Sequence, residues 1–181
     1  MFIITRILTC LILFYCHIDN TKTMNKKDLP TVASVDLNKY AGTWYEIAKF
    51  PNSFEKGLKC ITATYSLCPD GKIGVLNKGH KESDPGRISQ SNGKAWIPDP
   101  AYPARLKVQF FWPFAGNYYI MELDDHYQYA LVGDPSRNYL WILCRTKQID
   151  PAIYERLTAK AKSLGFDISR IRMTPQDCSP S

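Results

Sequence analysis

The side chains of this chain that could carry out chemistry are its cysteines, its histidines and one pair of adjacent carboxylates. His17, His80 and His126 share no spacing that suits metal ligands, so the sequence predicts surface histidines and no metal site. Asp124 and Asp125 could suggest acid catalysis as paired carboxylates, but adjacent residues on a strand point to opposite faces, so we expect a role in a turn. The sequence also has no phosphate loop and no catalytic triad, so the pattern favours binding over catalysis.

Length and composition indicate one domain with an aromatic-rich interior. At 181 residues the chain is long enough to bury a sizeable core. Aromatic residues make up 13% of the chain and supply surfaces of the kind that line ligand cavities. The net charge of +6 is scattered along the chain, which argues against a nucleic-acid site but allows weak attraction to anionic membranes.

The first 16 residues have the pattern of a secretory signal. A single positive charge at Arg6 precedes an almost unbroken apolar run, residues 7–16, that is too short to span a bilayer. Residues 17–35 are mostly polar and are predicted to form a flexible tether. We therefore expect an exported protein whose folded domain covers residues 36–178.

Cys16 ends the apolar run at the place where a bacterial lipoprotein carries its acylated cysteine. Leu13 lies at the expected third position before it. Phe14 and Tyr15 are large where small residues are usual. Lipidation of Cys16, ordinary cleavage and an uncleaved anchor are thus three alternatives.

The main body of the chain alternates apolar and polar residues in short segments. In one of them Ile61, Ala63 and Tyr65 share a face, with threonines on the other. The predicted strands are residues 42–50, 59–67, 72–79, 89–97, 104–112, 117–123, 127–133 and 138–145. Eight antiparallel strands with short links favour an all-β, up-and-down barrel with room for one small ligand.

One α-helix is predicted after the last strand. Asp150 can cap it, Pro151 suits its first turn and Gly165 suits the residue after its end. Its apolar stripe consists of Ile153, Leu157, Ala161 and Leu164. We expect this stripe to pack outside the barrel on the face of Ile142 and Cys144, leaving Trp141 inside.

Three short motifs resemble those of the lipocalins. They are Gly42-x-Trp44 followed by Tyr-Glu, an altered Asp124-Asp125-His126, and Arg145 after Trp-Ile-Leu. Residues 36–178 are most similar to the bacterial outer-membrane lipocalins and apolipoprotein D. The resemblance implies a structural role for Gly42 and a cation–π contact of Arg145 with Trp44 that closes the barrel floor. Separately, Glu46 is expected to point inward near the floor, where it forms hydrogen bonds and does not react.

The resemblance also implies a disulfide between Cys60 and Cys178 that pins the C-terminal tail to the barrel. Cys68 on a turn and Cys144 under the helix have opposed environments, so we expect them not to pair. Cys10 belongs to the signal segment.

The predicted cargo is an amphiphile, because burial of an acyl chain contributes roughly 0.8 kcal/mol per methylene while the head group stays at the wet rim. Inward parity selects the candidate wall residues Tyr65, Val75, Asn77, Leu106, Val108, Phe110 and Trp141. In the family, the positions that match Asn77 and Trp141 line the pocket. No cofactor is implied.

We therefore expect a non-catalytic carrier of fatty acids or lysophospholipids that serves membrane maintenance at the bacterial envelope. It would be an outer-membrane lipoprotein, or periplasmic or secreted, and a homodimer is one option for its assembly. An alternative that the resemblance implies is a lipid isomerase-type enzyme that uses a cavity thiol, for which Cys60 is the candidate unless Cys178 pairs with it. Another is an envelope interaction protein whose cavity is incidental.

Overall fold

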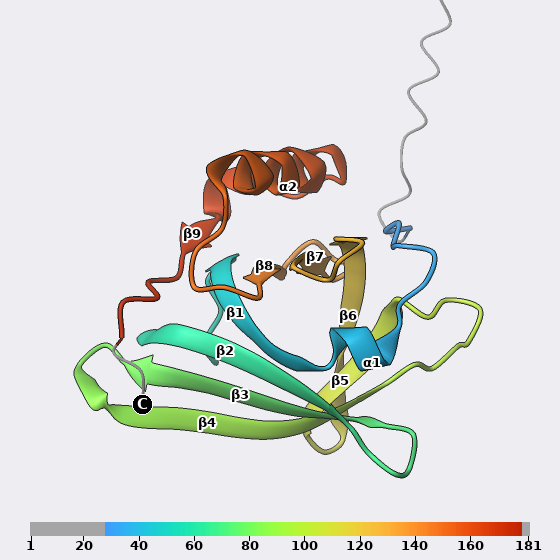
Figure 1. Cartoon of the computed structure of the whole chain (residues 1–181), viewed down its shortest axis with the longest axis horizontal. Coiled ribbons are helices and arrows are strands. Elements are labelled where there is room, and N and C mark those ends of the chain that lie inside the picture. The colour runs from blue at the N-terminus through green and yellow to red at the C-terminus, as the bar shows by residue number, and fades with distance from the viewer. Residues whose placement is uncertain (1–27, 179–181) are drawn as a thin grey trace, which may run out of the picture.

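The computed structural model describes residues 28–178 and shows a closed antiparallel β-barrel with one long helix against its outer wall (Figure 1). The predicted signal segment and Cys16 lie outside the described residues. The elements are α1 (Leu37–Tyr40), β1 (Gly42–Lys49), β2 (Leu58–Leu67), β3 (Ile73–Lys81), β4 (Asp84–Trp96), β5 (Arg105–Phe111), β6 (Phe114–Leu123), β7 (Tyr129–Gly133), β8 (Leu140–Cys144), α2 (Pro151–Ser163), the 3-10 turn η1 (Ile168–Arg170) and β9 (Arg172–Met173). Within this part of the chain, no helix has the length and apolarity to cross a membrane.

The barrel closes because its first strand pairs on both sides. The strand order is β2-β3-β4-β5-β6-β7-β8-β1, and β1 pairs with β2 as well as with β8. Trp44 lies opposite Ala63 on one side of β1, and Tyr45 lies opposite Cys144 on the other. This confirms the predicted eight-stranded barrel, to which the short strand β9 is added beside β1.

Alternation along the strands divides the apolar residues into two clusters. The lumen cluster lies inside the barrel and includes Trp44, Tyr65, Val75, Leu106, Ile120 and Leu143. The helix-side cluster lies between the outer wall and α2 and includes Ile142, Cys144, Leu157, Ala161 and Leu164. Helix α2 therefore covers the face of β8 that the sequence predicts.

Helix α2 begins and ends at the predicted residues. The Asp150 side chain accepts a hydrogen bond from a backbone N–H of the first turn, and Pro151 is the first helical residue. Gly165 follows the helix with a φ of +85°, a conformation that glycine adopts without strain. Leu157 and Ala161, on the face of α2 that packs against the barrel, are fully buried.

Part of the segment predicted as a tether packs against the barrel instead. Leu29 is fully buried in the helix-side cluster, and the N–H of Val32 donates to the carbonyl of Ile120 at 3.0 Å. Asp28 lies 3.5 Å from the guanidinium of Arg105. The sequence prediction is wrong for residues 28–35 because isolated apolar residues in a polar stretch give no periodic signal.

The C-terminal tail fills a gap in the wall between β1 and β2. Pairing of the two strands stops at Tyr45, and the tail continues the hydrogen bonding from there. The N–H of Thr174 donates to Ile47 on β1 at 2.9 Å, and the N–H of Cys60 on β2 donates to Pro175 at 2.8 Å. The tail thus completes the wall where β1 and β2 separate.

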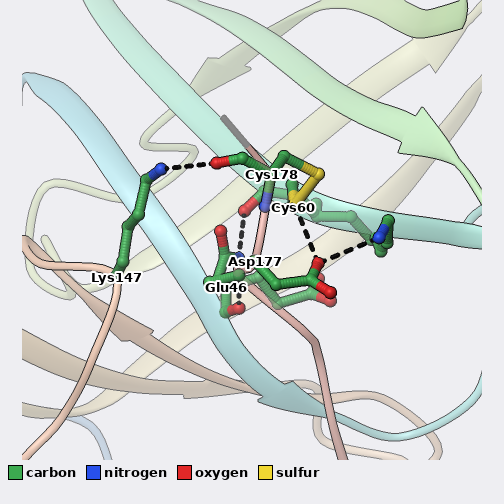
Figure 2. Close-up of a disulfide and its surroundings, with 8 residues drawn as sticks. Glu46, Cys60, Lys147, Asp177 and Cys178 are labelled. Carbon is green, nitrogen blue, oxygen red and sulfur yellow. Dashed lines mark hydrogen bonds and ion pairs between the residues drawn. A yellow bond between two sulfur atoms is a disulfide. The ribbon is translucent and has the colours of Figure 1, made fainter. Parts of the chain in front are cut away.

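Gln176 and a disulfide hold the tail in this gap. The side-chain amide of Gln176 donates to the carbonyls of Glu46, at 2.8 Å, and Ile61, at 3.0 Å, and so bridges the two strands. Cys60 and Cys178 form a disulfide with their Cα atoms 6.1 Å apart (Figure 2). The disulfide implied by the family resemblance is therefore confirmed.

We predict that Cys178→Ser lowers the free energy of unfolding by about 2–5 kcal/mol, because it releases a cross-link that closes a long loop. The sequence separation is 118 residues. Urea unfolding checks this, and reductant should destabilise the wild type by a similar amount. Cys68→Ser, which removes a free thiol, is the control and should leave the midpoint in place. Equal midpoints for Cys178→Ser and the control would contradict the prediction.

Candidate ligand-binding lumen

One end of the barrel, which we call the floor, is closed by Trp44 and Arg145. The guanidinium carbon of Arg145 lies 3.9 Å from the centroid of the Trp44 ring, in cation–π geometry. The indole N–H of Trp44 donates to the carbonyl of Tyr40 at 2.8 Å. The Arg145 guanidinium donates to the backbone carbonyls of Lys39, Tyr40, Ala41, Thr43 and Tyr127. One side chain thus ties α1, β1 and the β6–β7 turn together across the floor.

Gly42 allows this arginine to approach the backbone of β1. Its φ of +96° lies in the region that favours glycine. A β-carbon at Gly42 would lie 3.3 Å from Nη1 of Arg145. A larger residue would therefore be strained and would press on the guanidinium.

Three tyrosines near the floor form hydrogen bonds with one another. The hydroxyl of Tyr118 lies 2.7 Å from that of Tyr40 and 2.8 Å from that of Tyr65. Burial raises the pKa of Tyr65 to about 12 and holds the pKa values of Tyr40 and Tyr118 well above their ordinary value. The hydroxyls therefore stay neutral. Sequence reasoning selected only Tyr65, because the other two come from α1 and β6, far away in the chain.

The seven candidate wall residues all lie on the inner face of the barrel. Tyr65, Val75 and Leu106 are buried members of the lumen cluster. Val108, Phe110 and Trp141 pack against that cluster and keep part of their surface exposed. Asn77 is two residues from Val75 on β3 and pairs with Ala63, so it faces inward too. Their role as ligand contacts stays a prediction.

The opposite end of the barrel, which we call the mouth, is open to solvent. Ser91 and Gly116 occupy inward positions, since they pair with Asn77 and Val108, yet both are exposed. The side-chain oxygen of Asn77 is buried and accepts no hydrogen bond from any described residue. Because a buried acceptor without a partner is costly, Asn77 can stabilise a donor group of a ligand.

A group of charged side chains lies in the wall between the lumen and the tail. A β-bulge in β1 shifts the register after Glu46, so Ala48 faces α2 and Lys49 faces inward opposite Trp141. The ammonium of Lys49 lies 3.0 Å from Glu46 and 3.1 Å from Glu55. The hydroxyl of Thr174 in the tail donates to Glu46 at 2.5 Å. Glu46 thus has the inward, hydrogen-bonding role expected of it, whereas Lys49 was not predicted, because strict alternation would turn it outward.

The pKa of Glu46 is raised to about 7, mainly by burial and also by the nearby Glu55 carboxylate, against the opposing effects of Lys49 and of the hydrogen bond from Thr174. Glu46 is only 2% exposed, so desolvation of its charge is the dominant cause. With Glu46 protonated, Lys49 and Glu55 balance each other. When Glu46 ionises, this part of the wall gains a net negative charge.

The free cysteines of the described residues lie outside the lumen. Cys144 is buried in the helix-side cluster, and Cys68 lies in the β2–β3 turn. Cys60, the candidate for a cavity thiol, is consumed by the disulfide with Cys178. Asp124, which could have suggested acid catalysis, accepts hydrogen bonds from the backbone of its own turn.

Two shallow recesses mark the outer surface. One lies beside the tail and is lined by Thr146, Lys147, Gln148, Pro175, Gln176 and Asp177. The other lies beneath the floor and is lined by Lys39, Asp125, His126, Tyr127, Gln128 and Arg145. Neither is formed by the wall residues of the lumen.

Comparison with known proteins gives consistent results. The family model described as Lipocalin-like domain matches residues 35–176. The outer membrane lipoprotein Blc of Escherichia coli K12 is 46% identical over 144 residues, which cover 80% of this chain and 81% of that protein. Temperature-induced lipocalin-1 of Arabidopsis thaliana is 42% identical over 164 residues, covering 86% and 87% of the two chains. The crystal structure of insecticyanin from Manduca sexta superposes with a TM-score of 0.65 at 26% identity, covering 84% and 85%.

We predict that Arg145→Leu lowers the free energy of unfolding by about 3 kcal/mol, because several backbone carbonyls and the Trp44 face lose their cationic partner. Arg145→Lys should recover only part of the loss, since one ammonium cannot reach the same set of carbonyls. Urea unfolding measures both. Arg156→Leu removes a surface arginine that contacts Tyr129 and should cost less than about 1 kcal/mol. Similar losses for Arg145→Leu and Arg156→Leu would refute the role given to the floor.

The raised pKa of Glu46 predicts a pH-dependent stability. Because its pKa of about 7 lies above the unfolded value, its contribution is complete below pH 4.5 and is lost as the pH rises through 7. The stability of the wild type relative to Glu46→Gln should therefore fall between pH 5 and 8, by roughly 2 kcal/mol. Denaturation at several pH values measures this, with the surface substitution Glu155→Gln as control. Parallel profiles for the wild type and Glu46→Gln would count against it.

Proposed function

The chain belongs to the lipocalin family, and on that premise we propose that it is a binding protein that carries a single-chain amphiphile, a fatty acid or a lysophospholipid, in its barrel. The observation that carries the proposal is the polarity gradient along the lumen. The floor end is buried and apolar, with tyrosine hydroxyls that pair among themselves. Nearer the mouth, Ser91 and Gly116 are exposed, and the buried side-chain oxygen of Asn77 has no partner among the described residues. An acyl chain matches the first region, and a polar head matches the second.

The wall residues support cargo of this shape. Val108, Phe110 and Trp141 pack against the lumen cluster but keep part of their surface accessible from the mouth. Tyr139 stacks on Trp141 with ring centroids 5.9 Å apart and extends the aromatic wall toward the rim. Flat aromatic and branched surfaces of this kind accept flexible acyl chains without needing a fixed hydrogen-bonding pattern.

Carriage has more support than catalysis by a cavity thiol. Cys60 is in a disulfide, and the free thiols of the described residues are directed away from the lumen. Lipocalin relatives are generally binding proteins. We therefore take catalysis as the less supported alternative.

We propose that the protein acts at a bacterial envelope, where it maintains membrane lipids. The apolar segment of residues 7–16 supports export, and Cys16 at its end supports a lipid anchor. The name of the Escherichia coli relative, an outer membrane lipoprotein, agrees with this assignment. Since a similar barrel occurs in Arabidopsis, the assignment rests on the leader and not on the barrel.

We predict that Trp141→Ala weakens binding of a lysophospholipid about tenfold, because the variant loses a large apolar surface from the lumen wall. Calorimetric titration below the critical micelle concentration measures this without relying on tryptophan emission. Trp96→Ala is the matched control: Trp96 follows the inward Ala95 on β4 and therefore faces outward. Unchanged affinity for Trp141→Ala, or an equal loss for the two variants, would contradict the proposed site.

A further inference from the structure

The most exposed large apolar side chains of the described residues lie together on the turn between β5 and β6. Phe111 is 74% exposed, Trp112 86% and Phe114 78%. We name these three residues the aromatic tip. Large aromatic residues are normally at least half-buried. A single exposed aromatic side chain is common, but three on one turn form an apolar patch that indicates an interaction surface.

The sequence around the aromatic tip contains no charge. Residues 108–121 include no lysine, arginine, aspartate or glutamate, although 22% of the chain is charged. The register pairs Phe111 with Phe114 across the turn, so both aromatic rings and Trp112 project from one hairpin end. Such a tip is a convex apolar surface, which a flat protein surface cannot enclose.

The tip belongs to the mouth of the barrel. In an up-and-down barrel the β1–β2, β3–β4, β5–β6 and β7–β8 turns all lie at one end, away from the floor. Two further exposed aromatics, Phe54 and Tyr139, lie at this end and contact each other with ring centroids 6.0 Å apart. Among the described residues, the exposed large apolar side chains at the floor end are fewer, namely Leu67 and Tyr102. Apolar exposure is thus concentrated around the opening.

The tip is continuous with the lumen wall. Phe110, the residue before the tip, faces inward, and a β-carbon on Gly93 would lie 2.8 Å from its ring. Phe110 in the lumen wall and Phe111 in the exposed tip are therefore consecutive residues. An acyl chain leaving the lumen at this side would meet apolar surface and not a ring of charge.

The loops at this end of the barrel also carry charged side chains, which are mainly cationic. The β1–β2 loop and the β3–β4 hairpin carry Lys56, Lys78, Lys81 and Arg87 against Glu82 and Asp84. Lys59 and Glu55 nearby are already paired, with Asp177 and Lys49. The mouth end thus carries both exposed aromatic residues and an excess of positive charge.

From these observations we infer that the aromatic tip docks the mouth of the barrel onto a phospholipid bilayer containing anionic lipid. Tryptophan and phenylalanine are the side chains that partition into the interfacial region of a bilayer, and lysine and arginine are attracted to anionic head groups. A bilayer is also soft enough to accept a convex tip. A second copy of the chain fits less well, because two mouths meeting would bring the same excess of positive charge together.

Tryptophan fluorescence of the full-length chain, with Cys16→Ser in every variant to exclude acylation, tests the docking. The probe is vesicles of phosphatidylcholine containing phosphatidylglycerol, with and without brominated acyl chains. The Trp112 signal is the difference between the emission spectra of the Cys16→Ser parent and of the same chain with Trp112→Phe, a change that keeps the residue apolar. We expect vesicles to shift this signal to shorter wavelength and brominated chains to quench it. An unshifted and unquenched Trp112 signal overturns the inference.

Vesicle sedimentation gives the matched binding measurement. Replacing Phe111, Trp112 and Phe114 together by serine should weaken vesicle binding at least about tenfold. Tyr102→Ser, which removes an exposed aromatic residue at the floor end, is the control and should bind as the parent does. Equal binding by the triple variant and the control overturns the inference.

Two further measurements distinguish membrane docking from self-association and from a change in the lumen. Sedimentation velocity without lipid should show the same association state for parent and triple variant; self-association lost only in the triple variant would assign the tip to a homodimer and overturn membrane docking. Lysophospholipid affinity in solution should be unchanged in the triple variant, because none of its substituted residues lines the lumen. Failure of the docking test and failure of the cargo test are therefore distinguishable.

Discussion

The contact between Arg145 and Trp44 is the constraint on which the rest of the barrel depends. A closed sheet of eight strands has two open ends, and a ligand site needs one of them sealed. Trp44 fills the floor end of the barrel. The Arg145 guanidinium, which lies against the Trp44 ring, donates hydrogen bonds to carbonyls of α1, β1 and the β6–β7 turn. Partial burial of this guanidinium lowers the pKa of Arg145 from its ordinary value. Among the described residues, Arg145 is held at the floor by carbonyls and an aromatic ring, with no carboxylate paired to it.

Closure of the floor explains the gradient of polarity above it. Since water reaches the lumen from the mouth, the tyrosines near the floor must satisfy their hydroxyls with one another. Side chains nearer the mouth, such as Asn77 and Trp141, keep access to solvent. The wall itself is not complete from its eight strands alone, because the tail fills the space between β1 and β2. Gln176 holds it there, together with the Cys60–Cys178 disulfide (Figure 2).

The parts of this fold that depend on local pattern could be predicted from the sequence. Alternation of apolar and polar residues predicted the strands and their inner face, and capping residues predicted both ends of α2. The motifs that contain Trp44 and Arg145 indicated the family, and the family resemblance implied the disulfide. The parts that were missed depend on contacts between distant segments. A bulge at Ile47 turns Lys49 into the barrel, and no alternation rule anticipates a bulge. Residues 28–35 gain order only from the barrel surface they cover, and the tyrosine group assembles from three elements.

The central claim is that the lumen, entered from the mouth and closed at the floor, holds an amphiphile. Titration of isotope-labelled protein with a lysophospholipid that carries a spin label on its acyl chain tests this most directly. We expect paramagnetic broadening of the amide signals of Val75, Val108, Phe110 and Trp141 that is clearly stronger than the broadening of Ile153 and Tyr154 on α2. Broadening confined to the helix side or to the outer recesses, or no broadening at all, would contradict the account.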